Sequence, residues 1–221
     1  MKMHTLFAAC AALFLLGCTA SPDVRTSEDM VANADPYEIG TAGAFFTGFT
    51  GIGIKPGTFL INFAPRTNEV ILIMKNQGND THIFLDRKSR DIIMDASVRY
   101  LEQFESRTLE EKGKHLAEYG KLKAFMVWGL MTLNAEGTAA VSVGYEFNKE
   151  APYFTLTIPE TPNDRFEAVD RPSPIKRSGY FQIFFTRSQL IEFVEYLVQE
   201  NLESTLEEKN ISRASTDPDV Y

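Results

Sequence analysis

The sequence predicts an α+β protein built from antiparallel sheets and two amphipathic helices. Short segments alternate apolar and polar residues and are separated by hairpin-length turns, a pattern typical of antiparallel strands. Two longer segments, 89–108 and 187–203, repeat apolar residues at helical spacing. Each follows a group of four predicted strands. The body, 43–207, is therefore expected to contain two tandem ββββα units, 43–108 and 122–207, packed as a pseudo-dimer.

The first predicted unit consists of four short strands and a helix. Its strands lie, in order, at 43–54, 58–64, 69–75 and 81–85. In the helix, Met94, Val98 and Leu101 recur at positions i, i+4 and i+7, which places them on one face, and Ile93, Tyr100 and Phe104 widen this stripe. We expect this face to be buried against the sheet.

The second predicted unit repeats this order of elements. Its strands lie, in order, at 122–133, 139–147, 153–158 and 179–185. Thr186 and Gln189 fit a capping box, with Thr186 at the N-cap and Gln189 at N3, which marks the start of the helix. Leu190, Val194 and Leu197 form the apolar stripe of this helix.

Two predicted strand segments, 70–74 and 125–128, are apolar on both faces. Strands of this kind are usually covered on both sides. A helix on one face and a second sheet on the other would provide that cover. The packing of two ββββα units against each other therefore explains these segments at the sequence level.

The order of four strands and a helix, taken twice, resembles the PUR-repeat and Whirly-like single-strand nucleic-acid binders over about 43–207. This resemblance is topological and rests on no motif residue, so it implies a shape and not a function. The chain has 30 acidic and 22 basic residues and a net charge of −8. Such a balance does not provide the basic surface that phosphate binding requires. We therefore expect no nucleic-acid partner.

The N-terminal segment has the features of an export signal. An apolar run over 5–16 follows a positively charged start. This run is shorter than the roughly 20 residues that a transmembrane helix needs, and it has the length of a signal-peptide core. The motif Leu15-Leu16-Gly17-Cys18 at its end resembles a bacterial lipobox.

The lipobox resemblance implies a lipoprotein precursor. Residues 1–17 would be removed by cleavage after Gly17, and the Cys18 thiol would carry diacylglycerol, often with an additional N-acyl chain such as palmitate. Each buried methylene contributes roughly 0.8 kcal/mol, so two or three chains anchor a protein stably to a membrane. Thr19, rather than Asp, follows the cysteine and favours the outer membrane or cell surface over the inner membrane. An ordinary secretory peptide cut near Ala20, or an uncleaved anchor, remains open.

The remaining cysteine, Cys10, falls within the signal peptide. The mature chain then holds no disulfide, thiol nucleophile or cysteine zinc site. Residues 18–42 are expected to form the lipidated cysteine and a flexible tether, because they are polar and lack periodicity. Residues 208–221 are expected to form a disordered polar tail.

No motif points to a catalytic residue, a cofactor or a metal. His82 and His115 lie outside any recognisable ligand spacing, and neither a GxSxG elbow nor a P-loop is present. We therefore favour a non-catalytic binding or structural module of the envelope, with an envelope protein or a glycan as partner. An envelope hydrolase that uses carboxylates or a histidine remains the alternative.

The proline-rich stretch 159–178 is the predicted ligand-binding loop. Its prolines have fixed φ angles, so the loop loses less entropy when it becomes ordered on binding. It offers both apolar and charged contacts through Arg165, Phe166, Arg171, Lys176 and Arg177. A surface excursion without a partner remains the competing interpretation.

Overall fold

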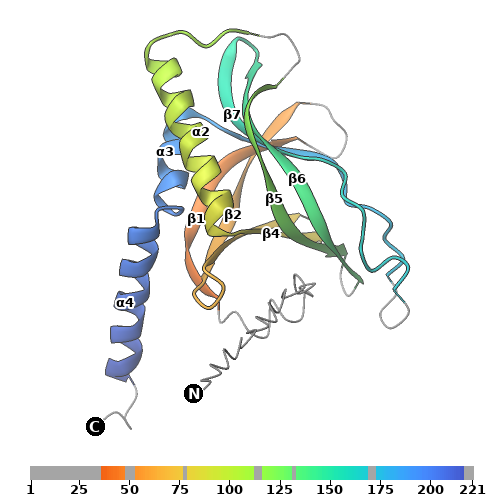
Figure 1. Cartoon of the computed structure of the whole chain (residues 1–221), viewed down its shortest axis with the longest axis vertical. Coiled ribbons are helices and arrows are strands. Elements are labelled where there is room, and N and C mark those ends of the chain that lie inside the picture. The colour runs from red at the N-terminus through yellow and green to blue at the C-terminus, as the bar shows by residue number, and fades with distance from the viewer. Residues whose placement is uncertain are drawn as a thin grey trace, which may run out of the picture.

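The protein folds into one closed antiparallel barrel of eight strands with helices against one side (Figure 1). This computed structural model describes residues 36–47, 53–76, 79–111, 116–130, 133–168 and 173–216. Each strand pairs with the next along the chain, and the first pairs with the last. The predicted signal peptide, the lipobox and Cys18 lie outside the described residues.

In each half of the described chain, four strands are followed by one or two helices. The first half contains β1 (Tyr37–Thr47), β2 (Ile54–Ala64), β3 (Glu69–Asn76), β4 (Asn79–Leu85) and α2 (Arg87–Glu105). The second half contains β5 (Ala117–Leu130), β6 (Leu133–Asn148), β7 (Ala151–Ile158), β8 (Phe181–Phe185), α3 (Arg187–Glu195) and α4 (Gln199–Thr216).

The predicted α+β pseudo-dimer with two helices in two ββββα units, 43–108 and 122–207, is wrong. The described chain forms one closed barrel with three helices, and the predicted helix 187–203 is divided into α3 and α4. Four strands and a helix do follow one another in each half, but β4 pairs with β5 and β1 pairs with β8. The two halves therefore share one closed sheet, and the shape implied by the PUR-repeat and Whirly-like resemblance does not apply. Strand periodicity is a local signal, and it does not reveal whether strands pair within one half or between halves.

The two strand segments that are apolar on both faces have a different explanation from the predicted one. Their inward side chains belong to the barrel core, and their outward side chains form a separate apolar cluster on the outer face of β2 to β5. This cluster consists of Leu60, Ala64, Ile71, Ile73, Phe84, Phe125 and Val127. It lies on the outside of a single barrel and not between two packed sheets.

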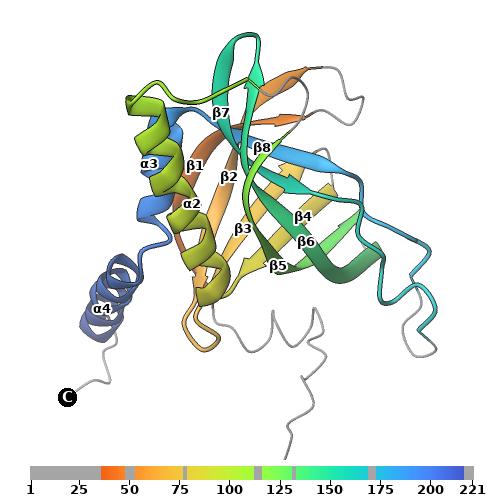
Figure 2. The same ribbon diagram turned by 45° about the horizontal axis from the view of Figure 1, so that its top comes forward.

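The barrel interior and the helices share one hydrophobic core. The rings of Phe185 on β8 and Phe193 on α3 stack with their centroids 4.8 Å apart, and Phe59 on β2 meets Phe193 edge-on at 5.7 Å. On α2, the buried Tyr100 hydroxyl donates a hydrogen bond to the Pro152 carbonyl at 3.0 Å. Helices α2 and α3 thus cover the barrel at the end where β4 and β8 finish (Figure 2).

The helix starts were predicted better than the helix faces. The Thr186–Gln189 capping box is present at the start of α3. On α2, Ile93 and Tyr100 of the predicted stripe are fully buried, but Val98 at its centre is 55% exposed. The apolar band on α2 is wide, so only the packing against the barrel decides which edge of it faces inward.

Two predicted segment boundaries also differ from the structure. The predicted tether, 18–42, extends too far, because β1 begins at Tyr37 and brings Ala42 into the core. Gly40 and Ala42 are too small to give a clear apolar alternation. The predicted disordered tail, 208–221, overlaps α4, which continues to Thr216.

Candidate functional site

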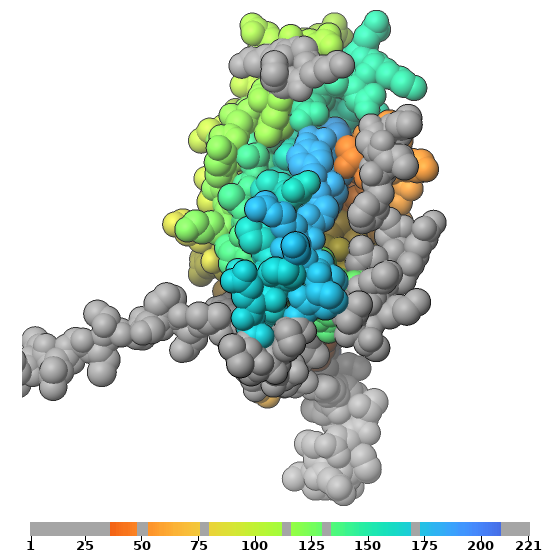
Figure 3. All heavy atoms as spheres, turned by 90° about the vertical axis from the view of Figure 1, so that its right-hand side faces the viewer, coloured from red at the N-terminus to blue at the C-terminus, as the bar shows by residue number. Residues whose placement is uncertain are grey.

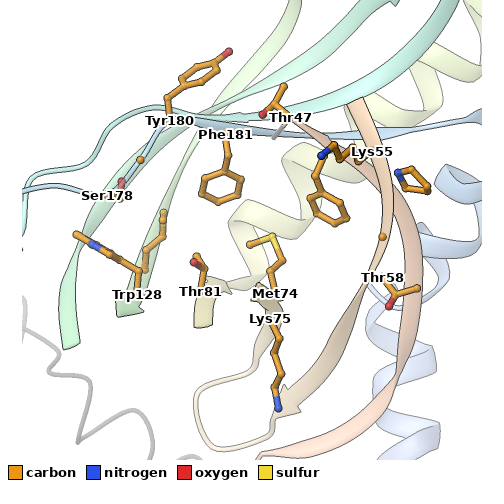
Figure 4. Close-up of a pocket in the computed structure, with 15 residues that line it drawn as sticks. Thr47, Lys55, Thr58, Met74, Lys75, Thr81, Trp128, Ser178, Tyr180 and Phe181 are labelled. Atoms are coloured by element: carbon orange, nitrogen blue, oxygen red, sulfur yellow. The ribbon is translucent and has the colours of Figure 1, made fainter. Parts of the chain in front are cut away.

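A pocket of about 430 Å³ lies in the mouth of the barrel, at the end opposite α2 and α3 (Figure 4). The final residues of β1, β3 and β5 contribute to it, together with the first residues of β2 and β4 and the segment that leads into β8. The strand ends meet at this mouth because each strand runs antiparallel to its neighbours. Cavities of this size hold small organic molecules in many proteins.

The floor of the pocket is apolar. Its aromatic and thioether side chains are Phe46, Met74, Met126, Trp128 and Phe181. Successive residues of a strand point to opposite faces, so these residues share the inward face with the barrel core beneath them. In Figure 4, the Met74 and Phe181 side chains point into the open space, and Phe46 also lines it.

Two glycines create room for the aromatic rings of the floor. A Cβ atom at Gly57 would lie 3.0 Å from Cε2 of Phe46, so the Phe46 ring rests directly against the β2 backbone. A Cβ atom at Gly137 would collide with the Pro162 carbonyl oxygen and lie 3.5 Å from Cη2 of Trp128. Gly137 therefore lets Trp128 and the β7–β8 connection pack closely on β6.

The described residues at the rim of the pocket include hydrogen-bond donors and no acidic side chain. Lys55 is paired with Phe46 in the β1–β2 register, which puts it on the inward face of its strand, and it is exposed at the mouth. Lys75 occupies the opposite face of β3, across from Asp80, and extends away from the pocket in Figure 4. The two rim lysines thus differ in direction although both border the same opening.

Two of the hydroxyl oxygens that line the pocket, those of Thr47 and Ser178, already accept hydrogen bonds. Oγ1 of Thr47 accepts a hydrogen bond from the Gln182 backbone N–H at 3.0 Å, and Oγ of Ser178 accepts one from the Thr161 backbone N–H at 2.9 Å. Both hydroxyl hydrogens therefore remain available for donation. The Trp128 side chain is 5% exposed, and its Nε1–H has no acceptor within the described part of the chain.

The predicted loop, 159–178, is folded in its described parts and stays outside the pocket for most of its length. Asn163 organises it, because its Oδ1 accepts from the Glu136 and Arg165 backbone N–H groups and its Nδ2 donates to the Ile175 carbonyl. Its side chains and those leading into β8 form a compact ridge in Figure 3. Ser178, the last residue of the loop, lines the pocket.

The four described binding residues predicted in this loop do not line the pocket. Arg165 lies with Nη1 4.0 Å from Oε2 of Glu136, and the Lys176 ammonium sits 5.1 Å from the centre of the Phe166 ring. Arg177 is exposed, and Arg171 lies outside the described residues. A binding role for these five residues stays a prediction.

Sequence reasoning missed the pocket because its floor consists of ordinary inward-facing strand residues. The same alternation of apolar side chains marks a filled core and a ligand cavity. One signal was present: Trp128, the only tryptophan of the chain, stands near the end of a long apolar strand. A large ring at a barrel end, beside the small residues Ala135 and Gly137 of β6, is consistent with an unfilled space.

Other titratable groups do not form a second site. His82 lies on the outer face of β4 and is partly buried, and burial lowers its pKa despite the neighbouring Asp80. Burial, followed by the charge of Glu136, raises the pKa of Asp164 in the β7–β8 connection. In the described ranges, no group of three or more histidine, cysteine or carboxylate side chains is placed to hold a metal ion. None of the described helices is both long enough and apolar enough to cross a membrane.

Comparisons with known proteins place the chain in a family. No solved structure matches it. It is 27% identical over 199 residues to an uncharacterized protein of Treponema pallidum (strain Nichols), a match that covers 88% of this chain and 67% of that protein. A family model described as "Uncharacterised Treponema protein" matches residues 36–204, which include the whole barrel, α2 and α3. The chain therefore belongs to this family of Treponema proteins.

Proposed function

We propose that this chain is a non-catalytic binding module whose barrel mouth takes up a small, largely apolar molecule. One observation carries the proposal: the mouth holds a 430 Å³ cavity with a floor of aromatic and thioether side chains. Eight-stranded barrels have an interior just wide enough to hold one small ligand when side chains do not fill it. Here the helices and the hydrophobic core fill one end of the barrel, and the cavity lies at the other end.

The chemistry of the lining favours binding over catalysis. Among the described residues, no histidine, cysteine or carboxylate lines the pocket. A general base must lie within hydrogen-bond reach of the proton that it removes, so the described lining offers no obvious proton acceptor. The lining instead combines a large apolar area with a few donors at the rim, which is the usual composition of a ligand-binding site.

The second part of the proposal places this module at the cell envelope. The lipobox-like motif that ends in Cys18 supports a lipid anchor there, and the family is bacterial. An anchored barrel would hold its ligand close to a membrane surface. Contact with an envelope protein or a glycan through 159–178 is a separate proposal that rests on the composition of that loop.

The pocket can be tested by blocking it. Thr81 stands between Met74 and Trp128 in the strand register and lines the pocket, so Thr81→Phe places a ring in the cavity. Thr138→Phe adds the same ring at an exposed position on β6 and serves as the matched control. The chain from Thr19 onward keeps every described element and is suitable for the measurement.

The readout is energy transfer from Trp128 to the neutral fluorescent probe N-phenyl-1-naphthylamine. We expect transfer with the unaltered protein and with Thr138→Phe. Thr81→Phe should weaken binding about tenfold or more, which corresponds to ~1.4 kcal/mol. Circular dichroism and thermal unfolding establish that both variants are folded. Absence of transfer in the unaltered protein, or equal binding by both variants, would show that the cavity is not the binding site.

A further inference from the structure

We infer that the pocket selects amphipathic anions, in which an acyl chain or similar apolar tail carries one anionic head group. This inference rests on the proposed function and specifies the ligand class for the same site. It follows from the positive charge of Lys55 at the mouth and from the Thr47 and Ser178 hydroxyl groups, whose oxygens already accept hydrogen bonds. An apolar tail alone would not need such a rim.

Two hydroxyl groups at the mouth can donate hydrogen bonds to a ligand. The Thr47 and Ser178 oxygens already accept from backbone N–H groups at 3.0 and 2.9 Å, so their hydrogens point to a further acceptor. Ser178 is 6% exposed, and the buried Trp128 Nε1–H also lacks an acceptor among the described residues. The Trp128 Nε1–H is not solvent-accessible, so the Thr47 and Ser178 hydroxyls are the donors that the acceptor oxygens of a ligand would satisfy.

Lys55 supplies the charge. It shares the inward register with Phe46, and within the described residues no carboxylate lies within 4 Å of its ammonium group. The lining that the structure describes holds no acid that would neutralise this charge. In Figure 4, Lys55 extends across the mouth on the side of Thr47, so one head group can meet a cation and a hydroxyl donor together.

The floor suits a flexible tail. Met74 and Met126 are unbranched and polarizable, and thioether side chains adapt to irregular apolar partners. Phe46, Phe181 and Trp128 surround them with flat apolar surfaces. A tail that enters between these rings leaves its head group at the rim, next to the donors.

The decisive comparison uses three probes with the same ten-carbon tail and different head groups: decanoate, decanol and decylamine. Each is titrated below its aggregation concentration while the fluorescence of Trp128 is recorded. Because Trp128 is the only tryptophan, its signal reports on the pocket itself. We expect decanoate to bind about tenfold more tightly than decanol, and decylamine to bind most weakly.

Two lysine variants separate the charge of Lys55 from general surface charge. Lys55→Gln should reduce decanoate binding to the level of decanol and leave decanol binding unchanged. Lys75→Gln removes a positive charge from the same opening, but its side chain points away from the pocket, so decanoate binding should persist. Added salt should weaken decanoate binding more than decanol binding, because exposed charges are screened.

The possible failures are distinguishable. Equal affinity for the three probes, or equal losses in Lys55→Gln and Lys75→Gln, would overturn the anion preference while the pocket itself stands. If neither these probes nor the neutral naphthylamine changes the Trp128 signal, the proposed function fails and the anion preference fails with it.

Discussion

His82 is a partly buried base on an otherwise apolar strip of the barrel exterior. Its cross-strand neighbours are Ile73 on β3 and Val127 on β5. Burial lowers the pKa of His82 from its ordinary value of 6.5. The negative charge of Asp80 raises this pKa, and the positive charge of Lys75 lowers it further. The imidazole is therefore held in its neutral form by the folded protein more than by the unfolded chain.

This lowered pKa makes stability depend on pH in a defined direction. As pH falls through about 6.5, the unfolded chain takes up a proton at His82 before the folded protein does, so the free energy of unfolding decreases. His82→Gln removes this contribution. We expect urea unfolding at about pH 7.5 and 5.5 to show a smaller loss of stability on acidification for the variant than for the unaltered protein. Identical losses in the two proteins would contradict the assignment.

At the scale of elements, Arg90 joins α2 to the end of α3, the start of α4 and the β2–β3 turn. Its side chain is buried, with 1% exposure. Nη1 donates to the Leu197 carbonyl at 2.9 Å, and Nη2 donates to Oδ1 of Asn68 at 2.9 Å and Oε1 of Gln199 at 2.8 Å. One guanidinium group therefore satisfies acceptors from three separate segments, and it fixes how the helices sit on the barrel.

Removal of the Arg90 side chain should lower the stability of the folded protein. Arg90→Ala leaves the Leu197 carbonyl and the Asn68 amide oxygen without a donor, and we expect the free energy of unfolding to fall by about 2–4 kcal/mol. Arg90→Lys should recover only part of this, because an ammonium group does not reproduce the planar fork. Chemical denaturation measures both. Arg99→Ala, an exposed arginine on the same helix, is the control and should change stability by less than about 0.5 kcal/mol.

Local patterns in the sequence predicted the elements well and their assembly poorly. The Thr186–Gln189 capping box identified the start of α3, because it depends on residues that are neighbours in the chain. Val98 was assigned to the buried face of α2 and is exposed, since packing against distant strands decides that face. The sequence did not predict the pocket for a related reason. Met126 and Trp128 have the same inward alternation as residues that fill the core. A cavity is a property of the packed barrel, and periodicity carries no signal for it.

At the scale of the whole molecule, the proposed lipid anchor on Cys18 has the sharpest test. Metabolic labelling of the full chain in a bacterial host with a palmitate analogue should label the unaltered protein. Cys18→Ala should abolish the label, because the thiol that receives the lipid is gone. Cys10→Ala removes the other cysteine and should leave labelling intact. Equal labelling of the unaltered chain and Cys18→Ala would rule out the lipobox interpretation.

Barrel closure has a consequence for the order of events during synthesis. β1 pairs with β2 along most of its length, but its other edge meets β8 at Phe45–Phe184 and Phe46–Ile183. β8 is the last strand to be made, so the outer edge of β1 stays uncovered while most of the chain emerges. Uncovered strand edges promote association with other chains, and pairing over such long sequence separations is slow. The newly made protein is therefore most vulnerable to aggregation before residue 184 becomes available, and a holding chaperone would act in that interval.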